Sequence, residues 1–253
     1  MSGLLDGRRI VLTGGVANIG AATARLFAAE GASLLLVDRN PAVEDTAAAI
    51  AHETGAQVTA LVADVSSAHS MALLDEIATT RMGGVDGLVN NAAVHLVGPV
   101  EEFAPADWDS TFAVNVRSCF LTVRALVRAM RTAGGGTIVN TSSQVGLHGA
   151  PGATAYSASK GAIIAFTRAL ALELAGDGIR VNAICPGWVD TDFNAPAIAM
   201  LGGVEAHAAL VSSSVPMGRQ AQPDEIAAGT LFLSSGMSSY MTGQVLPIDG
   251  GVT

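Results

Sequence analysis

Residues 8–31 read RRIVLTGGVANIGAATARLFAAEG and join an apolar run to a helical pattern through a glycine turn. Residues 8–13 predict a buried strand, and residues 18–31 place Ile19, Leu26 and Phe27 on one face of a helix. Because only a few residues separate the two patterns, the segment predicts a strand that turns directly into a helix. The same unit recurs further along the chain.

Short apolar runs alternate with helical patterns through the remaining sequence. We predict further strands at residues 33–37, 58–62, 87–90, 136–143, 179–185 and 244–249. Further helices are expected at residues 41–55, 67–81, 107–132, 154–176 and 223–234. This alternation predicts an α/β doubly wound (Rossmann) fold over residues 1–253, a single domain with a seven-stranded parallel sheet and helices on both faces. Residues 188–220 show no clean period, as is typical of a lid or a binding loop.

The composition restricts the partners that the chain can have. Its formal net charge is −9, which argues against a nucleic-acid partner. The sequence has no run of about 18 apolar residues and no targeting segment, so we expect a cytoplasmic protein with no membrane span. Cys119 and Cys185 form no CxxC pattern, and the histidines show no metal-ligand spacing, so we expect free thiols and no metal.

The turn TGGVANIG at residues 13–20 can bind an anion. It lies between a strand and a helix, so backbone N–H groups and the helix N-terminus would face a pyrophosphate. Asp38 stands at the end of the second strand, where a carboxylate can accept hydrogen bonds from both hydroxyls of a ribose. The alternative is a glycine-rich turn followed by an incidental acidic residue. The position of Asp38 favours a dinucleotide site.

Two further strand ends are predicted to line the same crevice. Asp64 and Val65 follow the third strand, and Asn90, Asn91 and Ala92 end the fourth. In open α/β sheets, ligands bind beyond the carboxyl ends of the strands. Each of these residues alone is an ordinary loop residue, but together they predict one wall of a cofactor site.

Lys160 is the only lysine in the 253 residues, and it follows Tyr156 by four positions. On a helix the two side chains share one face. A free phenol has a pKa near 10 and is a poor base at neutral pH, and a neighbouring cation lowers that pKa. A compact ammonium can also reach a ribose hydroxyl, and Ser143 can hydrogen-bond the same substrate oxygen as Tyr156. The alternative, a surface lysine near a packed tyrosine, is disfavoured by the spacing.

These motifs together resemble those of the short-chain dehydrogenase/reductase family over essentially the whole chain. The matching stretches are TGGVANIG, Asp64-Val65, NNAA, Asn115, TSSQVG, YSASK, the Pro186-Gly187 turn with Thr191, and the terminal DGG. The resemblance implies that Tyr156 is the general acid/base, that Ser143 holds the substrate oxygen, and that Lys160 binds the nicotinamide ribose and lowers the tyrosine pKa. It also implies that Asn115 keeps an ordered water in a proton relay. The resemblance also implies a homotetramer, as the commonest assembly of the family.

The resemblance further implies a set of cofactor contacts. They are Gly14, Asn18, Ile19, Gly20, Asp38, Asp64, Val65, Asn91, Ala92, Tyr156, Lys160, Pro186, Gly187, Val189 and Thr191. The family pattern TGxxxGxG has glycine where this chain has Asn18, and the family's NNAG is NNAA here, with Ala93 last. Because asparagine tolerates a positive φ better than other non-glycine residues, we expect the turn to be retained.

The cofactor is predicted to be NAD rather than NADP. In this family NADP binders usually carry a basic residue in the glycine turn or just after the second strand, and the turn here has none. Asp38 would repel a 2′-phosphate. Arg39 follows directly, but an exposed ion pair contributes only about 0–1 kcal/mol, so we expect the carboxylate to dominate.

The resemblance places four residues in the substrate pocket: His95, Gln144, His148 and Trp188. Between Trp188 and Met217 there is no lysine or arginine, so we expect a neutral small-molecule alcohol or ketone with an apolar or lightly hydroxylated body. The apolar residues of this loop can equally be packing of a lid. The alternative enzyme is a 3-oxoacyl thioester reductase using NADPH. The alternative class is a catalytically idle NAD-binding regulator, against which the complete catalytic set argues.

Overall fold

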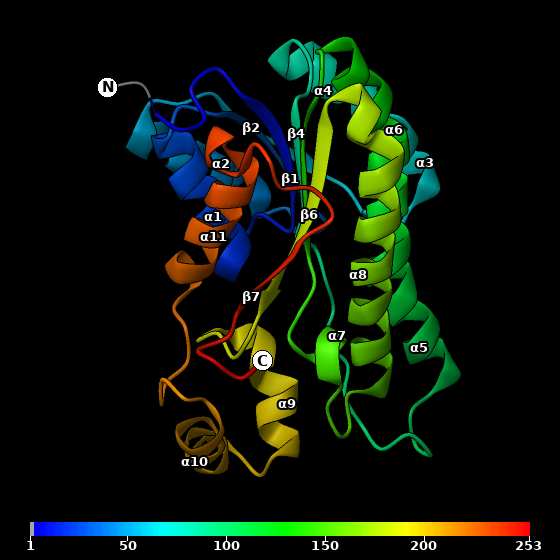
Figure 1. Ribbon diagram of the computed structural model, residues 1–253, viewed down its shortest axis with the longest axis vertical. Helices are drawn as coiled ribbons and strands as arrows, with labels where there is room; N and C mark the ends of the chain where they lie inside the picture. Colours follow the sequence, from blue (N-terminus) through cyan, green and yellow to red (C-terminus); the bar gives the residue numbers. More distant parts are fainter. Residues whose placement is uncertain (1–2) are drawn as a thin grey trace.

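A parallel sheet with helices on both faces forms the centre of the protein, whose computed structural model describes residues 3–253 (Figure 1). The seven strands are β1 (Arg9–Thr13), β2 (Ser33–Asp38), β3 (Val58–Val62), β4 (Gly87–Asn90), β5 (Gly136–Thr141), β6 (Ile179–Pro186) and β7 (Val245–Ile248). Every neighbouring pair is parallel, in the order β3-β2-β1-β4-β5-β6-β7. The predicted doubly wound fold is therefore confirmed.

The strand order reverses at the middle of the sheet. β1 pairs with β4 on one side and with β2 on the other. The chain therefore leaves β1 and β4 toward opposite halves of the sheet, and a crevice forms between the two connections at the carboxyl ends of the strands. This arrangement brings the predicted cofactor residues of β1, β2 and β4 to one edge.

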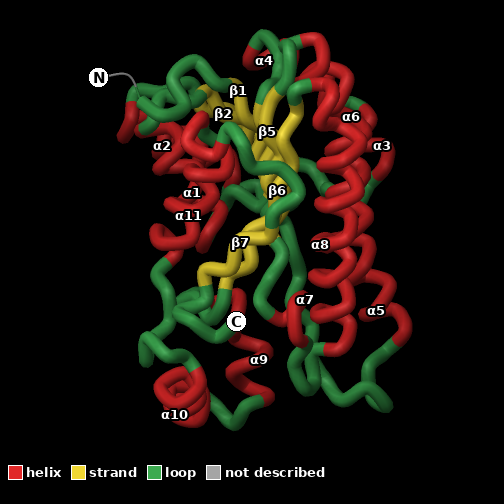
Figure 2. Tube along the Cα trace, in the orientation of Figure 1, coloured by secondary structure: helices red, strands yellow, loops and turns green. Residues whose placement is uncertain are grey.

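Helices separate into two layers, one on each side of the strands (Figures 1 and 2). One layer consists of α1 (Asn18–Ala29), α2 (Val43–Thr54) and α11 (Pro223–Ser234). The other consists of α3 (Ala68–Ala72), α4 (Leu74–Met82), α5 (Pro105–Phe112), α6 (Ser118–Thr132) and α8 (Thr154–Leu174). The end of α2 follows the sequence signal, because Gly55 closes it in the left-handed conformation with φ 71°.

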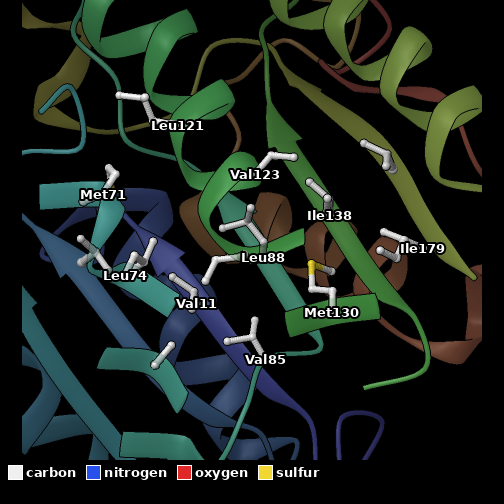
Figure 3. Packing of buried hydrophobic residues seen from close by; sticks show 14 of the residues in the cluster. Val11, Met71, Leu74, Val85, Leu88, Leu121, Val123, Met130, Ile138 and Ile179 are labelled. Atoms are coloured by element: carbon white, nitrogen blue, oxygen red, sulfur yellow. The ribbon is translucent and has the colours of Figure 1, made fainter. Parts of the chain in front are cut away.

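Each face of the sheet has its own hydrophobic core. Successive residues of a strand point to opposite faces. Ile10 and Leu12 accordingly pack with α1, α2 and α11, whereas Val11 packs on the other side. Figure 3 shows this second core, in which Val11, Leu88 and Ile138 meet side chains of the opposite helix layer. Burial on both faces explains why the strands read as continuous apolar runs.

Two predicted helices are interrupted. The pattern over residues 67–81 contains α3 and α4, which separate at Leu73. The pattern over residues 107–132 contains α5, a π-helical turn η1 (Ala113–Arg117) and α6. Ser118, Cys119 and Thr122 each hydrogen-bond a backbone carbonyl one turn back. Side chains that bond the backbone in this way bend helices, which accounts for the irregular turn.

The expectation of no regular structure over residues 188–220 is wrong. The segment contains η3 (Asp192–Asn194), α9 (Ala195–Met200) and α10 (Val204–Ser214). Gly202 and Gly203, with φ angles of 99° and 103°, separate α9 from α10. The helices were hidden in the sequence because APAIAM and VEAHAALVSSS carry small or apolar residues all round and so show no period.

Three short elements complete the described chain: α7 (Val145–His148), η2 (Ala175–Asp177) and η4 (Gly236–Ser238). Within residues 3–253, none of the individual helices has both the length and the apolar composition to cross a bilayer. One bent pair, Asp192–Met200 with Val204–Ser214 at 95°, meets these two criteria together. In the same residues, no group of three His, Cys, Asp or Glu side chains is placed to hold a metal ion.

Candidate active site

The glycine turn after β1 is packed so closely that side chains are excluded. A Cβ on Gly20 would overlap the carbonyl oxygen of Gly14, and a Cβ on Gly14 would lie 2.9 Å from the Cα of Ala92. Asn18 has φ 55° and is the one non-glycine residue with positive φ in residues 3–253. The expectation that asparagine retains the family's turn conformation is confirmed.

The N-terminus of α1 suits a phosphate group. The helix begins at Asn18, its N-cap Ala17 supplies no side-chain hydrogen bond, and its first turn has no acidic residue. The first N–H groups of a helix have no partner within the helix and attract anions. The turn and the helix start therefore fit the diphosphate of a dinucleotide, with Ile19 and Gly20 in the first turn.

Asp38 lies at the end of β2 beside the turn. Its Oδ2 accepts a hydrogen bond from the Val16 N–H at 3.4 Å, and its Oδ1 accepts one from the Asn40 N–H at 3.0 Å. The backbone thus holds a half-buried carboxylate where the second strand meets the glycine turn. This placement fits a ligand of ribose hydroxyls. Arg39 is exposed.

Thr13 ties the end of β1 to the end of β4. Its Oγ1 accepts hydrogen bonds from the N–H groups of Asn91 (3.1 Å) and Ala92 (3.2 Å). The Asn91 amide donates to the Gly14 carbonyl at 3.1 Å. The two predicted cofactor walls are therefore fixed to each other. Thr13 was not among the predicted site residues, because its role depends on which strand lies beside β1.

The turn after β3 is held by its own acid. The Asp64 carboxylate accepts hydrogen bonds from the Ser66 N–H (2.8 Å) and hydroxyl (2.7 Å), and Val65 is buried. On the opposite half of the sheet, the Gly187 N–H donates to the Ile248 carbonyl at 2.9 Å, just after Pro186 ends β6. These contacts place both predicted turns at the carboxyl edge of the sheet.

Tyr156 and Lys160 lie one turn apart on α8 and are both buried. The Lys160 Nζ donates to the Thr141 carbonyl at 2.7 Å and lies 5.5 Å from the centre of the Tyr156 ring. The Ser143 hydroxyl donates to the Pro186 carbonyl at 3.5 Å and accepts from the Val145 N–H at 3.4 Å, both long contacts. Ser142 directly follows β5, and its hydroxyl donates to the Lys160 carbonyl at 2.8 Å, which ties α8 to the end of that strand. The predicted catalytic side chains are therefore brought together.

Burial dominates the acid–base properties of this pair. It raises the pKa of Tyr156 above that of a free phenol, while the Ser143 side chain opposes the rise. It also lowers the pKa of Lys160 to about 8, and the thiols of Cys119 and Cys185 partly offset this. The net shift of the Tyr156 pKa is therefore upward, because desolvation of the phenolate is its largest cause. The Lys160 ammonium is directed at the Thr141 carbonyl.

Asn115 clamps three parts of the site from within η1. Its Oδ1 accepts from the Val94 N–H (2.8 Å), and its Nδ2 donates to the Val94 carbonyl (3.1 Å) and the Ser159 hydroxyl (3.0 Å). The Ser159 hydroxyl in turn donates to the Tyr156 carbonyl at 2.7 Å. Both polar atoms of this side chain thus have partners within the protein. Ser159 was not predicted, because its partner comes from another helix.

The ring of Tyr156 is covered by residues of the substrate side. The ring centre of His95 lies 4.2 Å from that of Tyr156, and Phe193 of η3 stacks on His95 at 5.5 Å. Burial lowers the pKa of His95 to about 4, so its ring is neutral at physiological pH. Of the predicted pocket residues, His95 therefore lies against the catalytic tyrosine.

The other predicted pocket residues have different placements. Gln144 is buried beside Ser143, and Trp188 meets the ring of His207 on α10 with 4.6 Å between centres. His148 is exposed, and its Nδ1 lies 2.9 Å from the Gly149 carbonyl oxygen, so it is not brought into this group. Phe193 and His207 were missed because α9 and α10 were not foreseen.

The segment after Trp188 is anchored to the sheet edge. Val189 is buried, and its carbonyl accepts from the Asn194 amide at 2.6 Å. An isolated parallel bridge joins Val189 to Ala221. Thr191 is the N-cap of η3. The predicted contacts Val189 and Thr191 thus lie where the chain leaves β6 for the helices that cover the site.

Comparison with known proteins supports this arrangement. A family model described as Enoyl-(Acyl carrier protein) reductase matches residues 15–253. Galactitol 2-dehydrogenase (L-tagatose-forming) of Cereibacter sphaeroides is 42% identical, covering 98% of this chain and 96% of that protein. A 3-oxoacyl-[acyl-carrier-protein] reductase of Chlamydia trachomatis serovar D is 37% identical over all of both chains. The crystal structure of NAD+-bound xylitol dehydrogenase superposes with a TM-score of 0.93 at 35% identity, covering 98% of this chain and 99% of that one.

These relatives are oxidoreductases with the same fold, and they match the chain along its whole length. The residues that carry the motifs, from the glycine turn to the Tyr156–Lys160 pair, occupy one edge of the sheet. The chain belongs to the short-chain dehydrogenase/reductase family.

Proposed function

We propose that this protein is an NAD-dependent dehydrogenase that interconverts a neutral secondary alcohol and its ketone. The observation that carries the proposal is the group formed by half-buried Ser143 with buried Tyr156 and Lys160, at the same sheet edge as Asp38. Ser143, Tyr156 and Lys160 supply acid–base chemistry at the substrate oxygen, and Asp38 supplies a ligand for the ribose hydroxyls. The names of several relatives, among them galactitol 2-dehydrogenase and cyclopentanol dehydrogenase, support this reaction class.

Proton transfer is the part of the reaction that the protein performs. The Ser143 hydroxyl, whose one donated contact is long at 3.5 Å, is free to donate a hydrogen bond to the substrate oxygen. The deprotonated Tyr156 oxygen takes the proton of the substrate hydroxyl, and the alcohol carbon loses a hydride. Bound NAD supplies the acceptor for that hydride. The products are a ketone, NADH and one proton, so atoms and charge balance.

Lys160 is suited to carry the proton onward. Its pKa of about 8 lets it accept and release a proton near neutral pH, whereas an exposed lysine stays charged. The raised pKa of Tyr156 makes the phenol a strong base once it has lost its proton. The lysine is thus a proton carrier in this proposal as well as a ribose ligand.

Asp38 supports NAD over NADP. Its carboxylate is fixed by two backbone N–H groups, so it cannot turn away from a 2′-phosphate without losing both hydrogen bonds. Arg39 is exposed and mobile side chains of this kind contribute little. One solved structure at 38% identity, named for an NAD(P)-dependent gluconate 5-dehydrogenase, holds NADP at low occupancy, whereas the xylitol dehydrogenase structure holds NAD+.

The second candidate is a 3-oxoacyl thioester reductase using NADPH. It is favoured by the 37% identical relative of that name and by the description of the matching family model. Against it stand the carboxylate of Asp38 and the absence of lysine or arginine between Trp188 and Met217. An idle NAD-binding regulator would not need the complete set of Ser143, Tyr156 and Lys160.

The test is turnover with both substrate classes. Purified protein is mixed with NAD or NADP and a set of secondary alcohols, or with NADH or NADPH and a 3-oxoacyl thioester, and the reduced cofactor is followed by absorbance. We expect NAD-dependent oxidation of alcohols, lost by at least about 100-fold in Tyr156→Phe while NADH binding persists. Reduction of the thioester with NADPH alone would establish the second candidate instead.

We also infer a homotetramer in the cytoplasm. The free, buried thiols of Cys119 and Cys185 fit a reducing compartment. Phe120 on α6 is 50% exposed and Leu172 on α8 is 85% exposed, and both helices lie in the same layer. Large apolar side chains left exposed in one layer support contact with further copies of the chain. Light scattering on the purified protein tests the assembly, and a monomer would contradict it.

A further inference from the structure

Four side chains around the catalytic group have a buried polar atom without a partner: His95, Gln144, Ser157 and His207. Gln144 and His207 are the two whose whole residue is more than nine-tenths buried. Gln144 is 7% exposed and its Oε1 has no hydrogen bond, and His207 is 3% exposed and its Nε2 has none. An unpaired buried polar atom costs about 1–3 kcal/mol, so its presence in a native protein calls for an explanation. Neither atom takes part in the hydrogen bonds that hold Tyr156 and Lys160.

Both atoms lie along the same short segment. The Gln144 N–H donates to the Pro186 carbonyl at 3.0 Å, and a Cβ on Gly187 would lie 3.0 Å from the Gln144 Oε1. The next residue is Trp188, whose ring meets the ring of His207. The two unpaired atoms therefore flank residues 187–188, directly after the strand that ends beside Ser143.

The chemistry of these atoms restricts their ligand. An amide oxygen only accepts hydrogen bonds, whereas a neutral imidazole nitrogen either accepts or donates one. Burial lowers the pKa of His207, which keeps this ring neutral. The surrounding segment contains Asp190, Asp192 and Glu205 but no basic residue, so it does not attract an anion. A hydroxyl group is neutral and can bond both atoms.

We propose that Gln144 and His207 form a subsite for a second hydroxyl, and that the substrate is a vicinal diol or a polyol. The inference rests on the proposed function, because Ser143 and Tyr156 hold the reacting oxygen. We assign to Gln144, the residue after Ser143, the hydroxyl on the carbon next to the reacting carbon. That second hydroxyl is unchanged in the reaction. The reacting carbon loses a hydride and its own hydroxyl loses a proton, so the product is a hydroxyketone.

The test compares alcohols that differ by one hydroxyl. The pairs are butane-2,3-diol against butan-2-ol, and cyclopentane-1,2-diol against cyclopentanol, all with NAD. A site built to bond a hydroxyl rejects the analogue that lacks it, so we expect the diols to have at least about 100-fold higher kcat/KM. Gln144→Met, which keeps the length and removes the acceptor, should reduce this preference to about tenfold or less.

His207→Phe should reduce the preference in the same way, and His148→Phe is its control. His148 is exposed and bonds only its own loop, so this control should keep the wild-type preference. Circular dichroism checks that each variant folds, and Gln144→Met still decides the matter if His207→Phe does not. A diol preference that survives in both folded variants would overturn the assignment of these residues.

A binding measurement separates this inference from the proposed function. The chain has two tryptophans, so Trp108→Phe leaves Trp188 as the only one, at the subsite itself. Titration of the NADH-loaded variant with a diol should change its fluorescence, and the matched mono-alcohol should not. If both members of a pair react at equal rates, the proposed subsite is wrong and the proposed dehydrogenase activity stands. Diol binding without any turnover contradicts the dehydrogenase and leaves the subsite. If no pair binds or reacts, both proposals are wrong.

Discussion

Two groups of buried polar side chains border the active site, and they differ in how fully they are hydrogen-bonded. Each polar side-chain atom of Asn115 and Ser159 has a partner within the protein, and together the two residues join η1, α8 and Val94 in the segment after β4. Gln144 and His207 are as well buried, yet each has an unpaired polar atom. Asn115 and Ser159 come from η1 and α8, whereas Gln144 is the N-cap of α7 and His207 comes from α10.

The difference separates positioning from recognition. A fully paired buried network has one favoured geometry and therefore fixes the side chains attached to it. An unpaired buried atom has no favoured partner until a ligand arrives. The chain thus holds Tyr156 and Lys160 rigidly and leaves hydrogen-bonding capacity where a substrate enters. Four changes test how the side chains around these two groups act, and the first should have the largest effect.

Lys160→Arg should reduce kcat/KM for alcohol oxidation by about 1000-fold, although the charge is kept. Lys160 is 2% exposed and its Nζ bonds the Thr141 carbonyl, so a larger guanidinium has no room. The wild-type rate should rise with pH through about pH 8, where Lys160 loses its proton, and arginine cannot supply this limb. Arg168→Lys, on an exposed position of α8, is the control and should behave as wild type. Overlapping pH profiles would show that the lysine is incidental.

Asp38→Ser should change cofactor choice by about 30-fold in each direction. Loss of a charged hydrogen-bond acceptor costs about 1.5–3 kcal/mol, so kcat/KM with NAD falls, and removal of the repulsion raises it with NADP. Asp45→Ser is the control, because this exposed carboxylate on α2 is not among the predicted cofactor contacts. A wild type that already prefers NADP would show that Arg39 dominates.

Ser159→Ala should lower kcat about tenfold with little change in the KM for alcohol, because it leaves the Asn115 Nδ2 partly unpaired and frees the Tyr156 carbonyl. Ser157→Ala is a matched control on the same helix, since its hydroxyl has no partner. Ser159→Thr keeps the hydroxyl and should recover most activity. A Ser159→Ala enzyme with wild-type kcat would mean that the paired group does not position the tyrosine.

The sequence was sufficient wherever function depends on local spacing. The four-residue interval of Tyr156 and Lys160, and the tolerance of Asn18 for positive φ, needed no knowledge of the rest of the chain. The carboxyl ends of parallel strands meet at one edge by topology alone, which explains why Asp38 and Asn91 were placed correctly.

What depends on distant packing could not be predicted. Ser159 acquires its role from Asn115, which lies 44 residues away in the chain. The direction of the Tyr156 pKa shift reverses because burial depends on how His95 and the η3 segment cover the ring. His207 reaches Trp188 only because α10 turns back after two glycines. These features require the path of the whole chain.

His95 should give the smallest effect, on stability rather than on rate. Burial lowers its pKa to about 4 from an ordinary value of 6.5, so the unfolded chain binds more protons than the folded one between these values. Stability should therefore fall as the pH drops from about 6.5 to about 4, by on the order of 2 kcal/mol from this group.

Urea unfolding at about pH 7 and about pH 4.5 measures this loss in the wild type, in His95→Phe and in His148→Phe. His95→Phe cannot gain a proton, so its stability should fall less on acidification than that of the wild type. His148 is exposed, and its replacement should leave the pH dependence unchanged. If wild type and His95→Phe lose the same free energy of unfolding, the ring is not held neutral against Tyr156. The substrate side of the site would then be looser than its contacts with Phe193 indicate.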